Sequence, residues 1–554
     1  MDNLNILMKG VDTLVTVVGA GFTGLYALHK LRDQMKVPVR VFESAPDVGG
    51  TWYWNNYPGA RCDIESIHYS YSFDEKLQQE WTWTEKFAAQ PEILKYLNHV
   101  ADRFDLRKDI HFNTKVSSVV WNEPEKYWLV TTNQGEVIKS RFMISGVGTL
   151  SVPKKPEFPG VENFKGPTLI TSNWPKQPVS LKGKRVAVIG TGSTGIQLIT
   201  EIAKEVGELY VFQRTPNYST PLGNAPNQAA EDQLNKKHYS QIRYHSRNHF
   251  LGVPYNEVQP SALAVSDEER LSVYENRYYR GGFRLFIDSY QDILFDTKAN
   301  ETVSEYIRQK IHQRVHKKEV AELLAPQDYC YGTKRPPMES GYYEVFNQNN
   351  VHLVDVKKTP ITRIEENGVV VGDKLYEVDI LILATGFDAM TGPLFALGLE
   401  GKNKEKLADK WKDGPRTYLG HTVSGFPNLF LVTGPQSPSV LYNMPLAIED
   451  HVDLATGIIQ HMLDEQLLEI DAEAQAEEEW VNHANELAQA SLLPNTDSWY
   501  MGANIPGKPR RCLVYLGGAP KYREICDEVV SANYKGFKFV AAADAHPAFL
   551  EHVS

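Results

Sequence analysis

A strand, a glycine-rich turn, a helix and a second strand follow one another near the N-terminus, over residues 14–43. The first strand is an apolar run rich in β-branched residues, which favours a buried strand. The turn carries the pattern G-x-G-x-x-G in Gly19, Gly21 and Gly24. Such glycines make the tight turn, let the backbone approach a pyrophosphate and let the helix pack on the strand. Glu43 follows Gly24 by 19 residues, where a carboxylate accepts hydrogen bonds from a ribose. The sequence therefore predicts a Rossmann-like dinucleotide-binding domain.

The stretch that follows, residues 47–63, is rich in glycine and aromatic residues and contains a Pro-Gly turn, so we expect no regular helix there. It contains the pattern G-x-W-x-x-x-x-Y-P-G-x-x-x-D, filled by Gly50, Trp52, Tyr57, Pro58, Gly59 and Asp63. On this pattern the chain resembles the Baeyer–Villiger monooxygenases, which are FAD- and NADPH-dependent flavoproteins. The resemblance covers nearly the whole chain and is closest to the phenylacetone and steroid monooxygenase branch.

The order of strand, glycine turn, helix and strand recurs in the middle of the chain. The second turn and the strand end that follows it contain Gly190, Thr191, Gly192, Ser193, Thr194, Gly195, Arg214 and Thr215. Arg214 has the position that Glu43 has in the first unit, again 19 residues after the third glycine. An arginine there neutralises a 2′-phosphate, whereas a carboxylate would repel it. We therefore expect FAD at the first site and NADPH at the second.

Two dinucleotide units in a chain of 554 residues predict an α/β protein with two Rossmann-like domains, one for FAD and one for NADPH. A polar, tyrosine-rich region with helical patterns predicts a helical insertion in the NADPH domain, and its charge runs are expected to be solvated helix faces. The expected parts are 1–150 and 386–554 for the FAD domain, 151–220 and 331–385 for the NADPH domain, and 221–330 for the insertion.

The resemblance also implies the chemistry. In the family, NADPH reduces the flavin, and the reduced flavin and O₂ form a flavin peroxide that converts a ketone to an ester or a lactone. Arg335 matches the catalytic arginine and Asp63 the acid that positions it. A guanidinium stays charged at any working pH and suits negative charge on oxygen. Lys334 matches a residue that helps to hold the 2′-phosphate, and Trp499 a loop tryptophan that closes over the nicotinamide side.

Further cofactor contacts that the resemblance implies lie at Gly50, Thr51, Trp52, Trp54, Asp63, Tyr69, Val116 and Met444.

One family motif is incomplete. The second signature, F-x-G-x-x-x-H-x-x-x-W, is met by Phe164, Gly166 and Trp174, but Ile170 stands where histidine is expected. Imidazole donates and accepts hydrogen bonds, and an isoleucine side chain does neither. In the family this histidine lies on the interdomain linker, away from the reacting carbonyl. The substitution therefore bears on domain coupling and on the efficiency of oxygenation.

Three functions are compatible with these residues. The first is Baeyer–Villiger oxidation of a ketone, with O₂ as co-substrate. The second is N- or S-oxygenation, or a largely uncoupled NADPH oxidase, on the same scaffold; Ile170 favours it more than histidine would. The third is a non-enzymatic redox-sensing or binding protein, against which the intact set of Asp63, Lys334 and Arg335 argues.

Composition excludes several other classes. A net charge of −11 gives no general attraction to nucleic acid. The four cysteines form no CxxC pair and no Cys/His metal spacing, so we expect no disulfide reductase and no metal site. Sparse cysteine fits a reducing cytoplasm, and neither a signal pattern nor a run long enough for a membrane span is present. We expect a monomer or a weak homo-oligomer.

Overall fold

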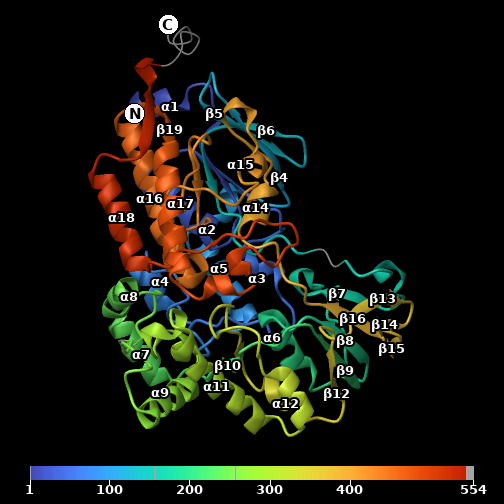
Figure 1. The fold of residues 1–554 in the computed structure, drawn as a ribbon. Helices are drawn as coiled ribbons and strands as arrows, with labels where there is room; N and C mark the ends of the chain where they lie inside the picture. Colours follow the sequence, from blue (N-terminus) through green and yellow to red (C-terminus); the bar gives the residue numbers. More distant parts are fainter. Residues whose placement is uncertain (1, 155–156, 256–257, 545–554) are drawn as a thin grey trace.

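The computed structural model describes residues 2–154, 157–255 and 258–544. It has three parts (Figure 1): an upper body around an eight-stranded sheet, a lower right lobe around a five-stranded sheet, and a group of helices at the lower left. Within the described residues, no helix is both long and apolar enough to cross a membrane.

The upper sheet contains strands from both the N-terminal and the C-terminal part of the chain. Its strands have the order β17-β4-β5-β6-β1-β2-β3, and β18 also pairs with β6. They are β1 (Thr13–Val18), β2 (Val39–Phe42), β3 (Ile110–His111), β4 (Val116–Asn122), β5 (Tyr127–Thr132), β6 (Val137–Ser145), β17 (Leu399–Glu400) and β18 (Leu429–Leu431). Because β1 is parallel to both β2 and β6, their carboxyl ends meet at one edge, where the first glycine turn begins.

The lower right sheet is fully parallel, with the order β12-β9-β8-β16-β7. Its strands are β7 (Thr168–Ile170), β8 (Arg185–Ile189), β9 (Glu208–Gln213), β12 (Val351–Asp355) and β16 (Ile380–Leu383). An antiparallel sheet of β13 (Ile361–Glu365), β14 (Gly368–Val371) and β15 (Lys374–Glu377) packs beside it. The two sheets confirm the prediction of two Rossmann-like units in an α/β protein.

Smaller strand pairs and a long helix complete the scaffold. The pairs are β10 (Thr220–Pro221) with β11 (Met338–Glu339), and β19 (Leu467–Ala472) with β20 (Phe537–Ala541). Helix α16 (Met444–Asp464) packs along the upper body, because its apolar residues recur every three or four positions and join the core of the first sheet. Those core residues are Ile448, Val452, Ala455, Ile458, Ile459, Met462 and Leu463.

The other helices of the upper body, in chain order, are α1 (Asp2–Met8), α2 (Phe22–Leu28) with its π-helical extension (His29–Gln34), α3 (Thr51–Trp54), α4 (Glu75–Glu80), α5 (Gln90–Arg103), α14 (Thr391–Phe395), α15 (Leu407–Lys410), α17 (Ala474–Gln489) and α18 (Ala519–Ser531). The lower right lobe contributes α6 (Ser193–Ile202) and α13 (Tyr342–Val345).

The insertion is helical, as predicted. It contains α7 (Ala229–Lys237), α8 (Tyr239–Asn248), α9 (Asp267–Arg280), α10 (Arg284–Ile287), α11 (Thr297–Arg314) and α12 (Lys318–Leu324). The expectation that its charge runs are solvated is wrong for part of α11. Arg308 and Lys310 are buried, and Arg308 pairs with Glu301 and Glu305 of its own helix while Lys310 pairs with Glu275 of α9. Burial is tolerated because each charge has a partner.

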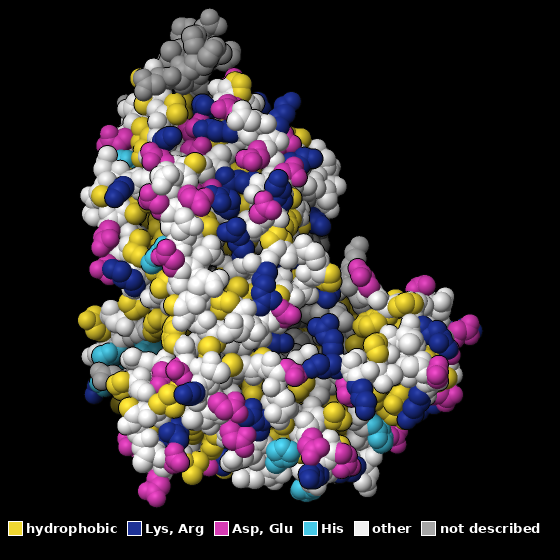
Figure 2. Space-filling view, in the orientation of Figure 1, with side chains coloured by type: hydrophobic (Ala, Val, Ile, Leu, Met, Phe, Trp, Pro, Cys, Tyr) yellow, Lys and Arg dark blue, Asp and Glu magenta, His cyan; other side chains and the backbone are white. Residues whose placement is uncertain are grey.

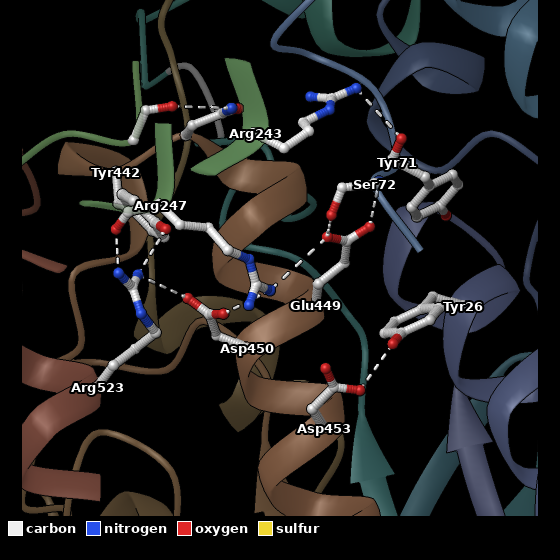
Figure 3. A network of polar contacts seen from close by, with 12 residues as sticks. Tyr26, Tyr71, Ser72, Arg243, Arg247, Tyr442, Glu449, Asp450, Asp453 and Arg523 are labelled. Carbon is white, nitrogen blue, oxygen red and sulfur yellow. Dashed lines mark hydrogen bonds and ion pairs between the residues drawn. The ribbon is translucent and has the colours of Figure 1, made fainter. Parts of the chain in front are cut away.

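A polar network ties the insertion to the upper body (Figure 3). Arg247 of α8 lies 2.9 Å from Asp450 of α16, and Arg523 of α18 lies 3.3 Å from the same carboxylate. Glu449 accepts hydrogen bonds from the backbone and hydroxyl of Ser72. Three segments that are distant in sequence therefore meet at two neighbouring carboxylates of one helix.

Candidate active site

The first glycine turn requires glycine for steric reasons. A Cβ on Gly19, whose φ is +103°, would lie 2.5 Å from the carbonyl oxygen of Gly146. A Cβ on Gly24 would lie 1.9 Å from the carbonyl oxygen of Gly19. Beside this turn, the Glu43 carboxylate is buried and accepts hydrogen bonds from the backbone amides of Ala20 and Ala45, each at 2.7 Å. The predicted acid therefore lies at the turn, at the end of β2.

The prediction that the aromatic stretch after Glu43 contains no regular helix is wrong for residues Thr51–Trp54, which form one helical turn, α3. Gly50, at φ +52°, passes so close to Gly21 that a Cβ on Gly50 would lie 3.0 Å from the Gly21 Cα. Trp52 is buried and donates from its indole nitrogen to the Tyr69 hydroxyl at 3.2 Å. The loop is thus fixed against the first turn.

The remaining residues predicted as cofactor contacts lie at element ends. Val116 starts β4 and packs in the apolar cluster that contains the ends of β1 and β2. Thr51 is exposed at the start of α3, and Trp54 is half-buried at its end. Met444 is half-buried at the start of α16.

The second turn repeats the first but leaves one side open. A Cβ on Gly190 would lie 2.4 Å from the carbonyl oxygen of Ala384, and one on Gly195 would lie 2.2 Å from that of Gly190. By contrast, a Cβ on Gly192 would meet no atom within 4 Å. Ser193 and Thr194 form the first turn of α6, whose amide groups lack partners within the helix.

The backbone around this turn is held by side chains. The Thr191 hydroxyl donates to the carbonyl oxygen of Thr215 at 3.2 Å. Asn217, which sequence reasoning missed, donates from its amide nitrogen to the carbonyl oxygen of Thr191 at 2.6 Å. The only signal for Asn217 in the sequence was that it is a polar residue shortly after Arg214.

Two cations lie near each other beyond β9. Arg214 is exposed, and Lys334 is half-buried with its ammonium 4.8 Å from the centre of the Tyr329 ring. Burial, and then the positive charge of Arg214, lower the pKa of Lys334. Among the described residues no ion pair with a carboxylate is found for either cation. Basic side chains also gather at the junction of the upper body and the lower right lobe in Figure 2. The pair is suited to a doubly charged anion.

Arg335 is held from several sides. Its Nη2 lies 2.9 Å from both carboxylate oxygens of Asp63, and its Nη1 donates to the carbonyl oxygen of Val440 at 3.0 Å. The Phe283 ring centre lies 4.7 Å from the guanidinium carbon. Burial alone would lower the pKa of Arg335, but Asp63 outweighs it, so the pKa is raised and the group remains charged. Asp63 and Arg335 come together as predicted, whereas Phe283 and Val440 carry no sequence signal.

The segment that contains Trp499 lies against the Arg335 turn. The Thr496 and Thr333 hydroxyls are 2.8 Å apart. Trp499 is half-buried and its ring centre lies 4.5 Å from that of Tyr500, which is itself buried beside Arg335. Burial raises the pKa of Tyr500 to about 12, although Arg335 acts in the opposite direction. Tyr500 was missed in the sequence, where only its neighbour carried a family match.

Ile170 lies at the carboxyl end of the edge strand β7. It is half-buried and packs against the apolar cluster of the second sheet. Its side chain supplies packing but no hydrogen bond between the two lobes.

Comparisons with known proteins agree with this geometry. Residues 12–220 match the family model described as flavin-binding monooxygenase-like. The acetone monooxygenase (methyl acetate-forming) of Gordonia sp. (strain TY-5) is 42% identical over 94% of this chain and 98% of its own length. A protein named Baeyer–Villiger monooxygenase from Pseudooceanicola batsensis is 40% identical over 96% of this chain and 97% of its own length.

Solved structures match over the same extent. Oxidised steroid monooxygenase bound to NADP is 47% identical with a TM-score of 0.91, covering 95% of this chain and 99% of that one. The complex of OTEMO with FAD and NADP is 38% identical with a TM-score of 0.93, covering 96% and 100%. The resemblance found in the sequence is thereby confirmed, and the chain belongs to the Baeyer–Villiger monooxygenase family.

Proposed function

We propose that this chain uses NADPH and O₂ to convert a ketone to an ester or a lactone, with FAD as its bound cofactor. The observation that carries the proposal is the partly buried Arg335–Asp63 pair, which joins the end of the segment after the first glycine-turn unit to the turn that also contains Lys334. The related enzyme whose name specifies methyl acetate as product performs a reaction of this class.

FAD fits the residues of the first turn. Gly21 and Gly50 pass each other without side chains, so the backbone is accessible to a pyrophosphate there. Glu43 has a carboxylate at the end of β2 for the ribose hydroxyls, although in this structure that carboxylate accepts hydrogen bonds from backbone amides. Gly19, Gly21, Gly24, Glu43, Gly50 and Trp52 would hold this cofactor.

NADPH fits the second turn. The open space beside Gly192 and the first amides of α6 suit a pyrophosphate. Arg214 and Lys334 would bind the 2′-phosphate, because two neighbouring cations, neither of them in an ion pair within the part of the chain that the structure describes, gain most from an added anion. When bound, the flavin accepts hydride from NADPH and passes electrons on to O₂.

Arg335 would act on the charge that develops at oxygen. A guanidinium in a site with little water stabilises a developing oxyanion strongly, and Asp63 keeps it in place and charged. Val440 and Phe283 limit its movement from two other directions. Trp499 would cover the nicotinamide side, because its segment already packs on the turn that contains Lys334 and Arg335.

The wider assignments follow from these sites. We propose that residues 1–150 with 386–554 serve FAD, that 151–220 with 331–385 serve NADPH, and that 221–330 form an insertion between the two NADPH parts. We further propose a cytoplasmic enzyme that is a monomer or a weak homo-oligomer and acts without nucleic acid or membrane.

Product analysis tests the function. The purified, FAD-loaded enzyme is incubated with NADPH and O₂ and with a cyclic ketone, an aryl ketone or a thioether, and products and hydrogen peroxide are measured per NADPH. Formation of a lactone or an ester from either ketone supports the proposal. Oxidation of the thioether alone, or release of peroxide alone, would point instead to the heteroatom-oxidising or oxidase alternative.

A further inference from the structure

The signature stretch ends in a segment, residues 57–63, that lies between the two lobes. Toward the upper body, its backbone pairs with residues around the start of α5. The Cys62 amide donates to the carbonyl oxygen of Ala88 at 3.1 Å, and the Gln90 amide donates to that of Ala60 at 2.9 Å. Asp63, the last residue of this segment, holds Arg335.

On its other side the 57–63 segment is hydrogen-bonded to the side chain of Gln197, a residue of helix α6. The Gln197 Oε1 accepts a hydrogen bond from the Tyr57 hydroxyl at 2.8 Å, and its Nε2 donates to the carbonyl oxygen of Arg61 at 3.0 Å. A carbonyl only accepts, so the amide orientation is determined by the Arg61 contact. Both ends of the amide are therefore used by the same segment.

Packing reinforces this contact. A Cβ on Gly59, which has φ +81°, would lie 2.7 Å from the carbonyl oxygen of Gln197, so the two backbones touch. Tyr57 and Ala60 are buried in the apolar cluster of the second sheet, together with Ile196 and Ile199 of α6. The first part of the 57–63 segment thus packs on the lower right lobe, whereas Cys62 is buried in the core of the upper body.

Helix α6 also begins at the second glycine turn. A displacement of α6 relative to the upper body would be transmitted through Gln197 to Arg61 and, two residues later, to Asp63. The side chain of Ile170 forms no hydrogen bond that could link the two lobes. Resting on the function proposed above, we propose that Gln197 is a positioning residue, which keeps the Asp63–Arg335 pair in a fixed place relative to the NADPH-binding turn.

The test compares two variants with a control on the same helix. Gln197→Met keeps the length of the side chain and removes both hydrogen bonds, and Tyr57→Phe removes one of them. Glu201→Gln is the control: its side chain is exposed, its Cβ stays beside Gly59, and only its surface pair with Lys204 is lost. All three are prepared as FAD-loaded enzymes.

The first readout needs no turnover. Hydrogen–deuterium exchange is followed in peptides covering the 57–63 segment and residues 331–337, with and without NADP⁺. In Gln197→Met, exchange in both peptides should become about three- to tenfold faster, as expected for loss of one or two net hydrogen bonds. Tyr57→Phe should have a smaller effect, and Glu201→Gln none.

The second readout separates positioning from general destabilisation. Flavin reduction by NADPH is measured without oxygen, and ester or lactone formed per NADPH is measured with oxygen. In Gln197→Met, reduction should stay within about twofold of the wild type, while product per NADPH falls about three- to tenfold. The melting temperature should match that of Glu201→Gln.

The outcomes are distinct. Unchanged exchange in both peptides of Gln197→Met would overturn the proposal, as would faster exchange with an unchanged yield of product per NADPH. A wild type that reduces its flavin but oxygenates no ketone would contradict the proposed function, and the exchange measurement would still decide whether Gln197 holds the 57–63 segment and Arg335.

Discussion

The side chain of Arg335 is fixed by residues from four separate stretches of the chain. Asp63 follows the first dinucleotide unit, Phe283 belongs to the insertion, Val440 precedes α16, and Tyr500 lies in the C-terminal part. A guanidinium held in this way cannot rotate freely when charge develops beside it. Preorganisation of this kind is the main source of electrostatic catalysis, because the group does not have to reorganise during the reaction.

Replacing Arg335 by alanine should therefore separate the two half-reactions. Hydride transfer needs stacked rings and no cation, so flavin reduction should be nearly unchanged, while formation of ester or lactone should fall by about 10²–10³-fold. NADPH would still be consumed, and the missing product should appear as hydrogen peroxide. Stopped-flow reduction and product analysis measure the two steps; equal product yields in Arg335→Ala and the wild type would remove Arg335 from the mechanism.

Arg214 should decide between the two nicotinamide cofactors. In Arg214→Ala, the KM for NADPH should rise by about tenfold or more, because one charge-assisted contact to the 2′-phosphate is lost. The KM for NADH, which has no such phosphate, should change little and acts as the internal control. Equal use of NADH and NADPH by the wild type would contradict this assignment.

Lys334 should give the same site a pH dependence. Its pKa is lowered by burial and by Arg214, so it loses its proton at a lower pH than an ordinary lysine. Only the protonated form attracts the phosphate, and the KM for NADPH should consequently rise as the pH increases toward alkaline values. Lys334→Arg, which stays charged, should have a flatter profile. Parallel profiles for the two enzymes would show that another group is responsible.

At the scale of the elements, helix α16 connects the parts of the molecule. Its apolar face joins the core of the upper sheet, and its polar face meets α8 of the insertion and α18 through Glu449 and Asp450 (Figure 3). Burial raises the pKa of both carboxyl groups, although the neighbouring arginines act against it. The insertion is thus attached to α16 through the buried carboxylates of Glu449 and Asp450.

Removing one of these charges should be costly. Asp450→Ala removes a buried carboxylate that pairs with Arg247 and Arg523. Because both arginines are partly exposed and Arg247 still lies 4.0 Å from Glu449, we expect the cost of a lost charge-assisted hydrogen bond, about 1.5–3 kcal/mol. Glu524 of α18 pairs with Lys521 on the surface, where both side chains are more than half exposed, so Glu524→Ala should cost about 1 kcal/mol or less. Urea unfolding of the two FAD-loaded variants measures both losses of stability. Similar midpoints for the two variants would contradict the predicted difference in cost.

At the scale of the whole molecule, buried histidines set the response to acid. Burial lowers the pKa of His68 and of His421 to about 4. An unfolded chain would protonate both near pH 6.5. Between these values the unfolded state binds more protons than the folded state, so the free energy of unfolding falls as the pH decreases, by about 3 kcal/mol for each histidine by pH 4.

The carboxyl groups of Glu449 and Asp450, whose pKa values are raised, act in the opposite direction below neutrality, because the folded protein holds their protons more firmly. His68→Gln isolates the histidine contribution. Its free energy of unfolding, measured by urea unfolding from pH 7 to pH 5, should depend less steeply on pH than that of the wild type. Identical slopes would exclude His68 as a source of acid sensitivity.

The sequence alone determined the local units of this protein. Glycines that a side chain would force into a backbone carbonyl, as at Gly24 and Gly195, can be recognised from their spacing, because a turn between strand and helix depends on neighbouring residues. Glu43 and Arg214 were found for the same reason. The pairing of Asp63 with Arg335 followed from the family resemblance, since nothing local connects residues so far apart.

The tertiary structure alone decided which distant residues meet. Gln197 looks like any polar residue of an amphipathic helix, and only the fold brings it to Tyr57 and Arg61. Lys310 appeared to lie in a solvated charge run but is buried against Glu275 of another helix. Side-chain burial and long-range hydrogen bonds depend on how elements pack, which patterns along a single chain do not encode. The dinucleotide turns could therefore be predicted, whereas the contacts of Arg335 with Phe283 and Val440 could not.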